Sequence, residues 1–173
     1  MSKVRNEEAA VYQTATVEQT ADAAVDLYEI ELSQLVAVAK YRLQGLFERE
    51  GFNSPKISAD FLTLEYSQTE REIFGVIWLD QQNRFIAKEE LFMGTVNQSS
   101  VHVREVLKAG LAKNAAACVF YHNHPSGRVS PSQADFAITK QLKEYLDVVD
   151  IRTLDHIVVG GGTWHSMAQA GEL

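Results

Sequence analysis

The chain reads His122-Asn123-His124-Pro125-Ser126-Gly127-Arg128-Val129-Ser130-Pro131-Ser132-Gln133-Ala134-Asp135 at the junction between an expected strand and an expected helix. Residues 115–121, just before this stretch, are small or apolar, which is typical of a buried strand. Successive side chains on a strand alternate in direction, so His122 and His124 point to the same side. Pro125 has no amide hydrogen and ends the strand. The sequence therefore predicts two imidazoles side by side at the end of a strand.

The helix after the turn has a strongly marked start. Ser130 fits the N-cap position, Pro131 fits N1, and Gln133 fits the N3 position of a capping box. These signals predict a helix over residues 130–146, with Ser130 as its cap and the Ser132 hydroxyl left free. Ser132 and Asp135 are three residues apart and share a helix face. The helix is therefore expected to bring a hydroxyl and a carboxylate back towards the two histidines.

His122, His124 and Asp135 can close on one divalent metal ion. Three protein ligands leave a tetrahedral zinc ion with one open position, and water there has its pKa lowered from about 15.7 to about 7. A His-x-His pair alone is a weak signal, but its fixed distance from a helix-borne Ser-x-x-Asp is much more specific. Cys118 is the only cysteine, so zinc would be held without thiolates. The pattern predicts a catalytic zinc site rather than a structural one.

A hydrolytic site also needs a general base next to the water, and local spacing does not fix this residue. Glu72 directly precedes the apolar run Ile73–Leu79, which is typical of a buried strand. Glu89 and Glu90 lie on the expected partner strand, after a turn at residues 80–83. From the local pattern alone, all three glutamates are candidates for the base.

Several residues also have purely structural interpretations. A serine in the first helical turn, such as Ser132, often bonds only to the backbone. His102 and His165 fit ordinary polar positions, while His156 fits a packed and hydrogen-bonded residue better than a metal ligand. Cys118 fits a small core residue. We therefore expect the metal ligands to come from the stretch that begins at His122.

The rest of the chain alternates strands and helices. Apolar runs and turns predict strands over residues 73–79, 85–92, 115–121, 157–159 and 163–167, and helices over residues 58–69, 100–113 and 130–146. This alternation predicts an α/β core with a mixed sheet flanked by helices, and we place it in a domain over residues 58–173.

The N-terminal part, residues 1–57, is expected to be a polar tail followed by a helical segment. A capping signal at Thr16 is followed by apolar residues at helical spacing, and the segment extends to Glu50. Gly51 fits a helix stop. A single helix of this length would measure about 50 Å, so we expect a break or a projection. Its long apolar stripe predicts a homodimer or partner-protein interface, with packing against its own domain as the alternative.

Charge and composition narrow the classes of partner. The chain has 173 residues, 46% of them hydrophobic, which suits one globular domain with a real core. Its 16 Lys and Arg against 23 Asp and Glu give a net charge of −7, which argues against nucleic acid without excluding it. No apolar stretch reaches the roughly 18 residues of a membrane span, and the N-terminus carries no secretory signal. We therefore expect a cytoplasmic protein without a membrane partner.

Several separated motifs occur in the order that is typical of one protein family. Besides the stretch that begins at His122, they are Arg71-Glu72-Ile73-Phe74, Gly94-Thr95-Val96-Asn97, Arg104-Glu105-Val106, Asn114-Ala115-Ala116-Ala117 and Leu154-Asp155-His156. From about Glu70 onwards the chain resembles the RadC family of bacterial JAB proteins, which carry the JAMM motif of the MPN metalloprotease superfamily. The resemblance implies an MPN-type α/β fold of cytidine-deaminase-like architecture and zinc-dependent hydrolysis of a peptide or isopeptide bond.

The resemblance also implies a role for each matching residue. The zinc ligands match His122, His124 and Asp135, the serine that supports the oxyanion matches Ser132, and the glutamate that moves protons matches Glu72. The chain lacks the helix-hairpin-helix pattern of longer members, which implies a short form. It has no room for the insertions with which related deubiquitinases hold ubiquitin. Two further functions stay open: a metal-dependent phosphodiesterase or nuclease linked to DNA repair, and a zinc-containing interaction module without catalysis.

Overall fold

The computed structural model describes residues 31–50, 52, 55–66, 69–94 and 101–173. The chain forms two compact units, Met1–Leu46 and Phe47–Leu173. Helix α2 begins at Leu32 and ends at Glu50. The first part of the helical segment expected from Thr16, and the expected stop at Gly51, lie outside the described residues. The homodimer interface of this segment therefore stays a prediction.

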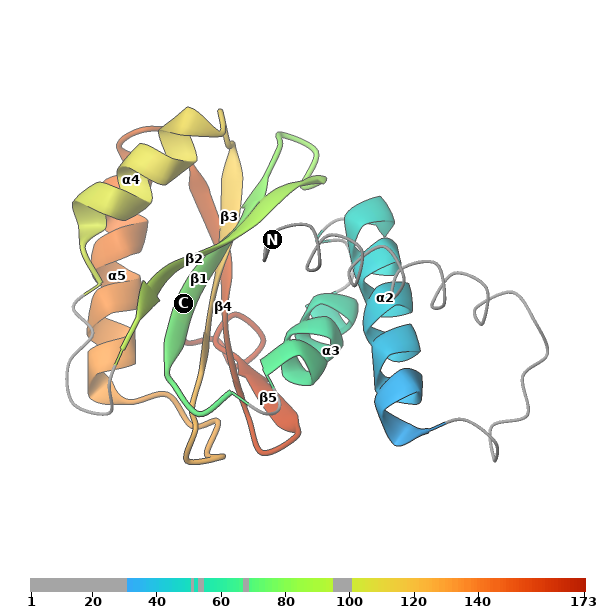
Figure 1. Ribbon diagram of the computed structural model, residues 1–173. Coiled ribbons are helices and arrows are strands. Elements are labelled where there is room, and N and C mark those ends of the chain that lie inside the picture. The colour runs from blue at the N-terminus through green and yellow to red at the C-terminus, as the bar shows by residue number, and fades with distance from the viewer. Residues whose placement is uncertain (1–30, 51, 53–54, 67–68, 95–100) are drawn as a thin grey trace, which may run out of the picture. The chain divides into compact units, whose positions relative to one another are not determined.

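Among the described residues, the sheet has five strands: β1 (Ile73–Leu79), β2 (Phe85–Met93), β3 (Ala117–Asn123), β4 (Arg152–Gly160) and β5 (Thr163–Ser166). They lie in the order β2-β1-β3-β4-β5 (Figure 1). β1 is antiparallel to both of its neighbours, β3 and β4 are parallel, and β5 returns antiparallel to β4. The mixed sheet predicted from the sequence is confirmed.

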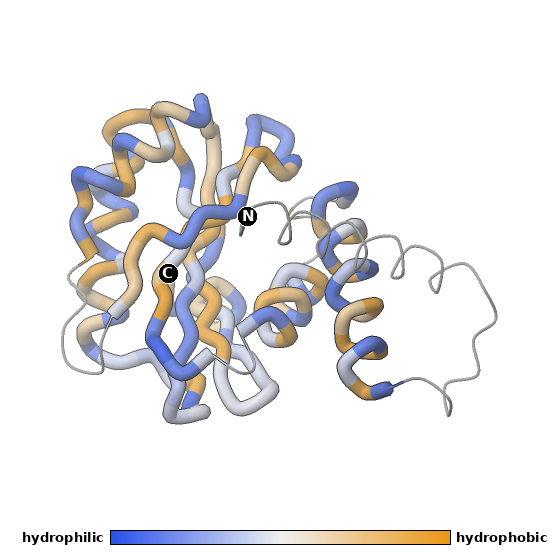
Figure 2. Tube along the Cα trace, in the orientation of Figure 1, coloured by the Kyte–Doolittle hydropathy of each residue, from blue (hydrophilic) through white to orange (hydrophobic). Residues whose placement is uncertain are grey.

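Helices cover both faces of this sheet (Figure 1). α4 (Val103–Ala112) and α5 (Gln133–Asp147) pack on one face, and α3 (Pro55–Tyr66) packs on the other, against β4 and β5. Figure 2 shows hydrophobic and hydrophilic residues alternating around α4 and α5, as expected for helices with one buried side. β1 and β3 are buried along their whole length, which explains their unbroken apolar runs.

The core between the sheet and helices α4 and α5 includes alternate residues of β1 and β3. Those from the strands are Phe74, Val76, Trp78, Cys118 and Phe120, and those from the helices and the following turn are Val106, Leu142, Leu146 and Ile151. Cys118 is fully buried, and burial raises the pKa of its thiol to about 12. It is therefore a core residue, as expected, and not a reactive one.

Helices α3 and α4 begin at other residues than the sequence pattern predicted. α3 begins at Pro55, three residues earlier than expected, since proline is favoured at the first helical position. α4 begins at Val103, after an N-cap at His102 with extended backbone, and the expected cap at Ser100 lies outside the described residues. Within the part of the chain that the structure describes, no helix combines the length and apolar character that crossing a membrane requires.

Candidate metal centre

The ends of two neighbouring strands bring Glu72 and the two histidines together. β1 runs antiparallel to β3, so residues before β1 lie beside residues after β3. β3 continues two residues further than the sequence pattern indicated and includes His122, and His124 follows the strand directly. Glu72 directly precedes β1. Ligand atoms of Glu72, His122, His124 and Asp135 all lie within 4.8 Å of one another.

The distances within this cluster match those between ligands of one metal ion. Nε2 of His122 lies 2.9 Å from Nε2 of His124. Oδ1 of Asp135 is 3.4 Å from Nε2 of His122, and Oδ2 is 3.5 Å from Nε2 of His124. Two ligand atoms of a tetrahedral zinc ion, each bound at its usual distance, are about 3.3 Å apart. The three side chains therefore already have the spacing of a metal-binding set.

The electrostatics of the cluster favour a positive charge. His124 donates its Nδ1 proton to the carbonyl oxygen of Arg128 at 2.6 Å, so the neutral ring keeps a lone pair on Nε2. The hydrogen bond to Asp135 raises the pKa of His124 above its ordinary value, against the effect of burial. Burial opposes ionisation of Asp135, but the neighbouring rings of His122 and His124, which can donate to it through Nε2 when they are protonated, hold the pKa of this carboxyl well below its ordinary value. A proton or a metal ion between these side chains would balance the negative charge of Asp135 and accept the lone pairs of the imidazoles.

The cluster is open on one side. His122 is buried, whereas the side chains of His124 and Asp135 are 17% and 14% exposed. A cavity of about 340 Å³ adjoins them. Besides Glu72, His122 and Asp135, its lining includes the apolar side chains of Phe74, Val101, Ala134 and Ile138. A small molecule in this cavity would therefore contact Glu72, His122 and Asp135 from the same side, against apolar walls.

Ser132, and not Ser130, is the N-cap of α5. Its Oγ accepts a hydrogen bond from the backbone N–H of Asp135 at 3.2 Å, and Oδ2 of Asp135 accepts one from the backbone N–H of Ser132 at 2.6 Å. The prediction that Ser130 caps a helix starting there was wrong. The charged carboxylate of Asp135 is a stronger acceptor than the amide of Gln133, so the capping box forms two residues later. The same box holds the Asp135 carboxylate beside the histidines.

Asn123, between the two histidines, holds the segment that carries Glu72. Its Oδ1 accepts a hydrogen bond from the backbone N–H of Ile73 at 2.7 Å, and its Nδ2 donates to the carbonyl oxygen of Arg71 at 2.8 Å. These two bonds bracket Glu72. The sequence pattern indicated only that Asn123 points away from the histidines. It missed this role because the bonded backbone groups are far away in the sequence.

The end of β4 fixes the backbone of the second histidine. The backbone N–H of His124 donates to the carbonyl oxygen of Val159 at 2.8 Å. A Cβ on Gly160 would lie 3.0 Å from the carbonyl oxygen of His124. A Cβ on Gly161, whose φ is +56°, would lie 2.8 Å from that of Gly127. A side chain at either position would press on the neighbouring backbone, so the two glycines allow the end of β4 and the turn after it to lie close to the His124–Gly127 segment.

Glu89 and Glu90, the other candidates for the general base, lie outside the cluster. Glu89 accepts a hydrogen bond from Nε1 of Trp78 at 2.8 Å and pairs with Lys113 at 2.9 Å. Glu90 accepts a hydrogen bond from the hydroxyl of Tyr66 at 2.7 Å. Both glutamates lie opposite the middle of β1, away from its start. Strand register therefore leaves Glu72 as the glutamate beside the histidines.

His156 lies directly behind His122. It is fully buried, its Nε2 is 2.8 Å from Nδ1 of His122, and its Nδ1 is 2.5 Å from Oγ1 of Thr139. Burial lowers the pKa of His156 well below its ordinary value, so the ring is neutral. As expected, His156 is packed and hydrogen-bonded, but the sequence pattern did not indicate that its partner belongs to the cluster. His165 pairs with Glu172 elsewhere, at 2.7 Å.

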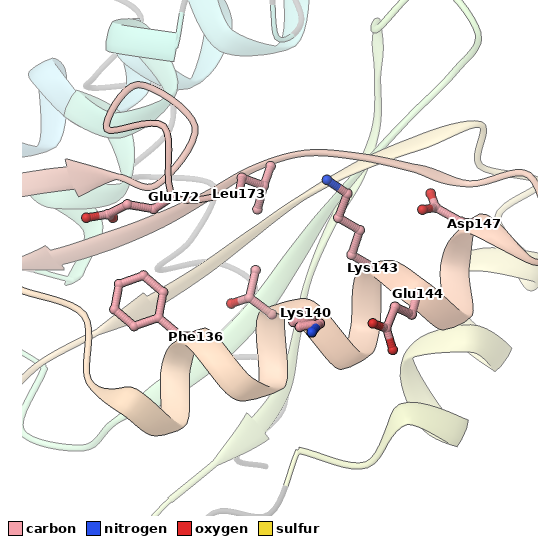
Figure 3. Close-up of a pocket in the computed structure, with 8 residues that line it drawn as sticks. Phe136, Lys140, Lys143, Glu144, Asp147, Glu172 and Leu173 are labelled. Carbon is pink, nitrogen blue, oxygen red and sulfur yellow. The ribbon is translucent and has the colours of Figure 1, made fainter.

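A larger hollow, of about 450 Å³, lies along α5 and the C-terminal residues (Figure 3). Lys140 and Lys143 line it together with the acidic Glu144, Asp147 and Glu172. Charges of both signs are mixed there, so the hollow favours neither an anion nor a cation. The smaller cavity, next to the cluster, is the one with convergent ligand atoms.

Comparison with known proteins agrees with this fold and cluster. Residues 52–172 match the family described as the RadC-like JAB domain. The chain belongs to the RadC family. Its mixed sheet and flanking helices are therefore those of the JAB, or MPN, fold. The RadC-like match covers β1, β3 and α5, and with them every residue of the cluster.

Similar proteins from several bacteria are named UPF0758. The UPF0758 protein of Pseudoalteromonas translucida (strain TAC 125) is 48% identical over 143 residues, which cover 82% of this chain and 64% of that protein. The UPF0758 protein of Cellvibrio japonicus (strain Ueda107) is 53% identical over 121 residues, or 70% of this chain and 54% of that protein. The aligned part of this RadC chain thus spans between about half and two thirds of these relatives.

Proposed function

We propose that this RadC-family chain is a zinc-dependent hydrolase that cleaves peptide or isopeptide bonds. The observation that carries the proposal is the position of Glu72 beside a set of three ligands with metal spacing. A structural zinc site is closed by four ligands, whereas a catalytic site keeps one position open. His122, His124 and Asp135 would leave that position open, and Glu72 adds a carboxylate next to it.

The chemistry of the ligand set supports zinc. His122 and His124 would bind it through Nε2, and Asp135 through its carboxylate. Imidazole and carboxylate ligands in a three-ligand set are typical of catalytic zinc. A zinc ion there would supply Lewis-acid chemistry, which lowers the pKa of water and polarises a carbonyl group.

Two residues of the chain would move the proton and support the developing charge. Glu72 takes a proton from the attacking water and passes it to the leaving nitrogen. Ser132 uses an acceptor site of its hydroxyl for the helix cap, which leaves the hydroxyl proton for a hydrogen bond to the oxyanion. Capping and oxyanion support are therefore compatible in one side chain.

The surroundings of the cluster support an amide substrate over a phosphodiester. The adjoining cavity has apolar walls at Phe74, Val101, Ala134 and Ile138, which suit an uncharged side chain. The net charge of −7 disfavours a polyanion. Phosphodiester cleavage commonly uses two metal ions, and the cluster has ligands for one.

The test of this function uses the full chain loaded with zinc. Mass spectrometry measures cleavage of a library that contains linear peptides and peptides joined through a lysine side chain. A parallel reaction measures cleavage of DNA. Peptide cleavage that stops with a chelator, returns with zinc and is absent from Glu72→Gln supports the proposal. Cleavage of DNA alone would assign the nuclease function instead. Tight zinc binding without cleavage of either would assign the interaction module.

A further inference from the structure

We propose that His156 and Thr139 are positioning residues that fix His122 in the tautomer able to bind a metal ion. One chain of hydrogen bonds links them. Nδ1 of His122 lies 2.8 Å from Nε2 of His156, and Nδ1 of His156 lies 2.5 Å from Oγ1 of Thr139. The hydroxyl of Thr139 lies 2.5 Å from the carbonyl oxygen of Asp135. The inference rests on the proposed metal site but not on the reaction proposed for it.

The direction of each hydrogen bond follows from the last acceptor. A carbonyl oxygen can only accept, so the hydroxyl of Thr139 donates its single proton to Asp135. Oγ1 of Thr139 then accepts, and Nδ1 of His156 carries a proton. A neutral His156 has one ring proton, which leaves its Nε2 as an acceptor. Nδ1 of His122 must therefore donate to it.

This direction determines which atom of His122 faces the cluster with a lone pair. A neutral His122 with its proton on Nδ1 has its lone pair on Nε2. That atom lies 2.9 Å from Nε2 of His124 and 3.4 Å from Oδ1 of Asp135. The opposite tautomer would place a proton among these acceptors and block metal binding. The hydrogen-bond chain thus selects the metal-binding form before any metal arrives.

Burial prevents water from replacing the partners in this chain. His156 is fully buried and Thr139 is 4% exposed. The rings of Phe74 and Phe120 meet the His156 ring edge-on, with centroids 5.7 Å and 5.8 Å away, so apolar walls fix its orientation. If the Thr139 hydroxyl is removed, the Nδ1 proton of His156 loses its acceptor. The ring is then more stable with that proton on Nε2, where it can be donated to Nδ1 of His122. The hydrogen bond between the two rings is thereby reversed.

The proton positions can be measured directly in the metal-free full chain. Long-range ¹H–¹⁵N NMR of the ring nitrogens, recorded at about pH 8 where an ordinary histidine is neutral, distinguishes the two tautomers. In the wild type we expect His122 with its proton on Nδ1. Thr139→Val, which removes the hydroxyl at similar volume, should shift His122 towards the Nε2-protonated form. Thr139→Ser keeps the hydroxyl and should retain the wild-type tautomer.

Zinc affinity provides the second readout. Thr139→Val should raise the Kd for zinc by about 10- to 100-fold, the usual loss of affinity when a group that hydrogen-bonds to a ligand is removed. Thr139→Ser should have a Kd close to that of the wild type. Thr153→Val is the matched control, because Thr153 is a buried threonine that contacts Cys118 rather than His156. Its zinc affinity should be unchanged.

The two readouts separate this inference from the proposed function. An Nε2-protonated His122 in the wild type, or equal tautomers and zinc affinities in Thr139→Val and Thr139→Ser, would overturn the positioning role. A wild type that keeps Nδ1-protonated His122 but binds no zinc would overturn the metal site and leave the hydrogen-bond chain standing. Because neither threonine variant changes a ligand or leaves a large cavity, both should fold.

Discussion

Phe74 of β1 lies directly opposite His122 of β3 in an antiparallel pair. Continuing that register by two residues puts Glu72 opposite His124, and directly opposed side chains lie on the same face of a sheet. One strand pairing therefore brings the proposed proton carrier to the proposed ligands, although they are far apart in the sequence. The first turn of α5 adds Asp135 from the same side.

Metal content tests the ligand set. The purified chain should bind about one zinc ion per molecule, as one three-ligand site implies. His124→Ala should lose most of this zinc, measured by elemental mass spectrometry after dialysis. His165→Ala should keep it, since that ring pairs with Glu172 and not with the cluster. Stoichiometric zinc in a His122→Ala, His124→Ala double variant would rule out the assignment.

Zinc should be released as the pH falls. A proton and a metal ion compete for Nε2 of His124, and the hydrogen bond to Asp135 raises the pKa of this ring. Above that pKa the ring is neutral and ready to bind. Below it, each pH unit should weaken binding by about tenfold, because a proton must be displaced. The onset should lie above the roughly 6.5 of an ordinary histidine. Zinc Kd values measured between about pH 8 and about pH 5 check this, and a constant Kd would contradict it.

Replacing Glu72 should separate metal binding from chemistry. Glu72→Gln should bind zinc normally and lose hydrolysis by about 100-fold or more, because the amide cannot take a proton from water. Glu90→Gln is the control, since its side chain accepts from Tyr66 and an amide oxygen can still do so. Peptide cleavage and zinc Kd are measured on both. Loss of zinc from Glu72→Gln would make Glu72 a ligand instead of a base.

Asn123 should control the rate through the position of Glu72. Asn123→Ala removes both hydrogen bonds that bracket Glu72 and should slow hydrolysis by up to about 100-fold, the cost of misplacing a reacting group by about 1 Å. Asn123→Asp keeps an acceptor for the backbone N–H of Ile73 and loses the donor to Arg71, so it should also be slow. Zinc Kd should stay near that of the wild type in both. A large loss of zinc affinity together with the rate would show that Asn123 supports the whole cluster.

The alanine variants of Ser132 and Ser130 should differ in their free energy of unfolding. Ser132→Ala should lower the free energy of unfolding by about 1 kcal/mol, the usual cost of a lost N-cap, and Ser130→Ala should change it little. Denaturant unfolding of the two variants measures this difference. If Ser132 also supports the oxyanion, its alanine variant should be slower by about 100- to 1000-fold, and Ser132→Thr should recover both properties. A destabilised but fully active Ser132→Ala would leave only the cap.

Local patterns in the sequence were sufficient to predict the strands and helices of the sheet domain and the residue types of the cluster. Strand alternation put His122 and His124 on one side, and helical spacing put Asp135 on the face that returns to them. Unbroken apolar runs identified the two central strands, because a strand buried on both faces has no polar side. These properties depend on neighbours within a few residues, so they can be read along the chain.

The tertiary structure decided what depends on contacts between distant segments. Strand register left Glu72, and not Glu89 or Glu90, beside the histidines. Competition between two overlapping capping boxes put the cap at Ser132, where the carboxylate of Asp135 accepts more strongly than an amide. The roles of Asn123 and His156 arise from hydrogen bonds to residues on other elements. No local periodicity encodes such bonds, because they form only when the sheet has set which strands lie side by side.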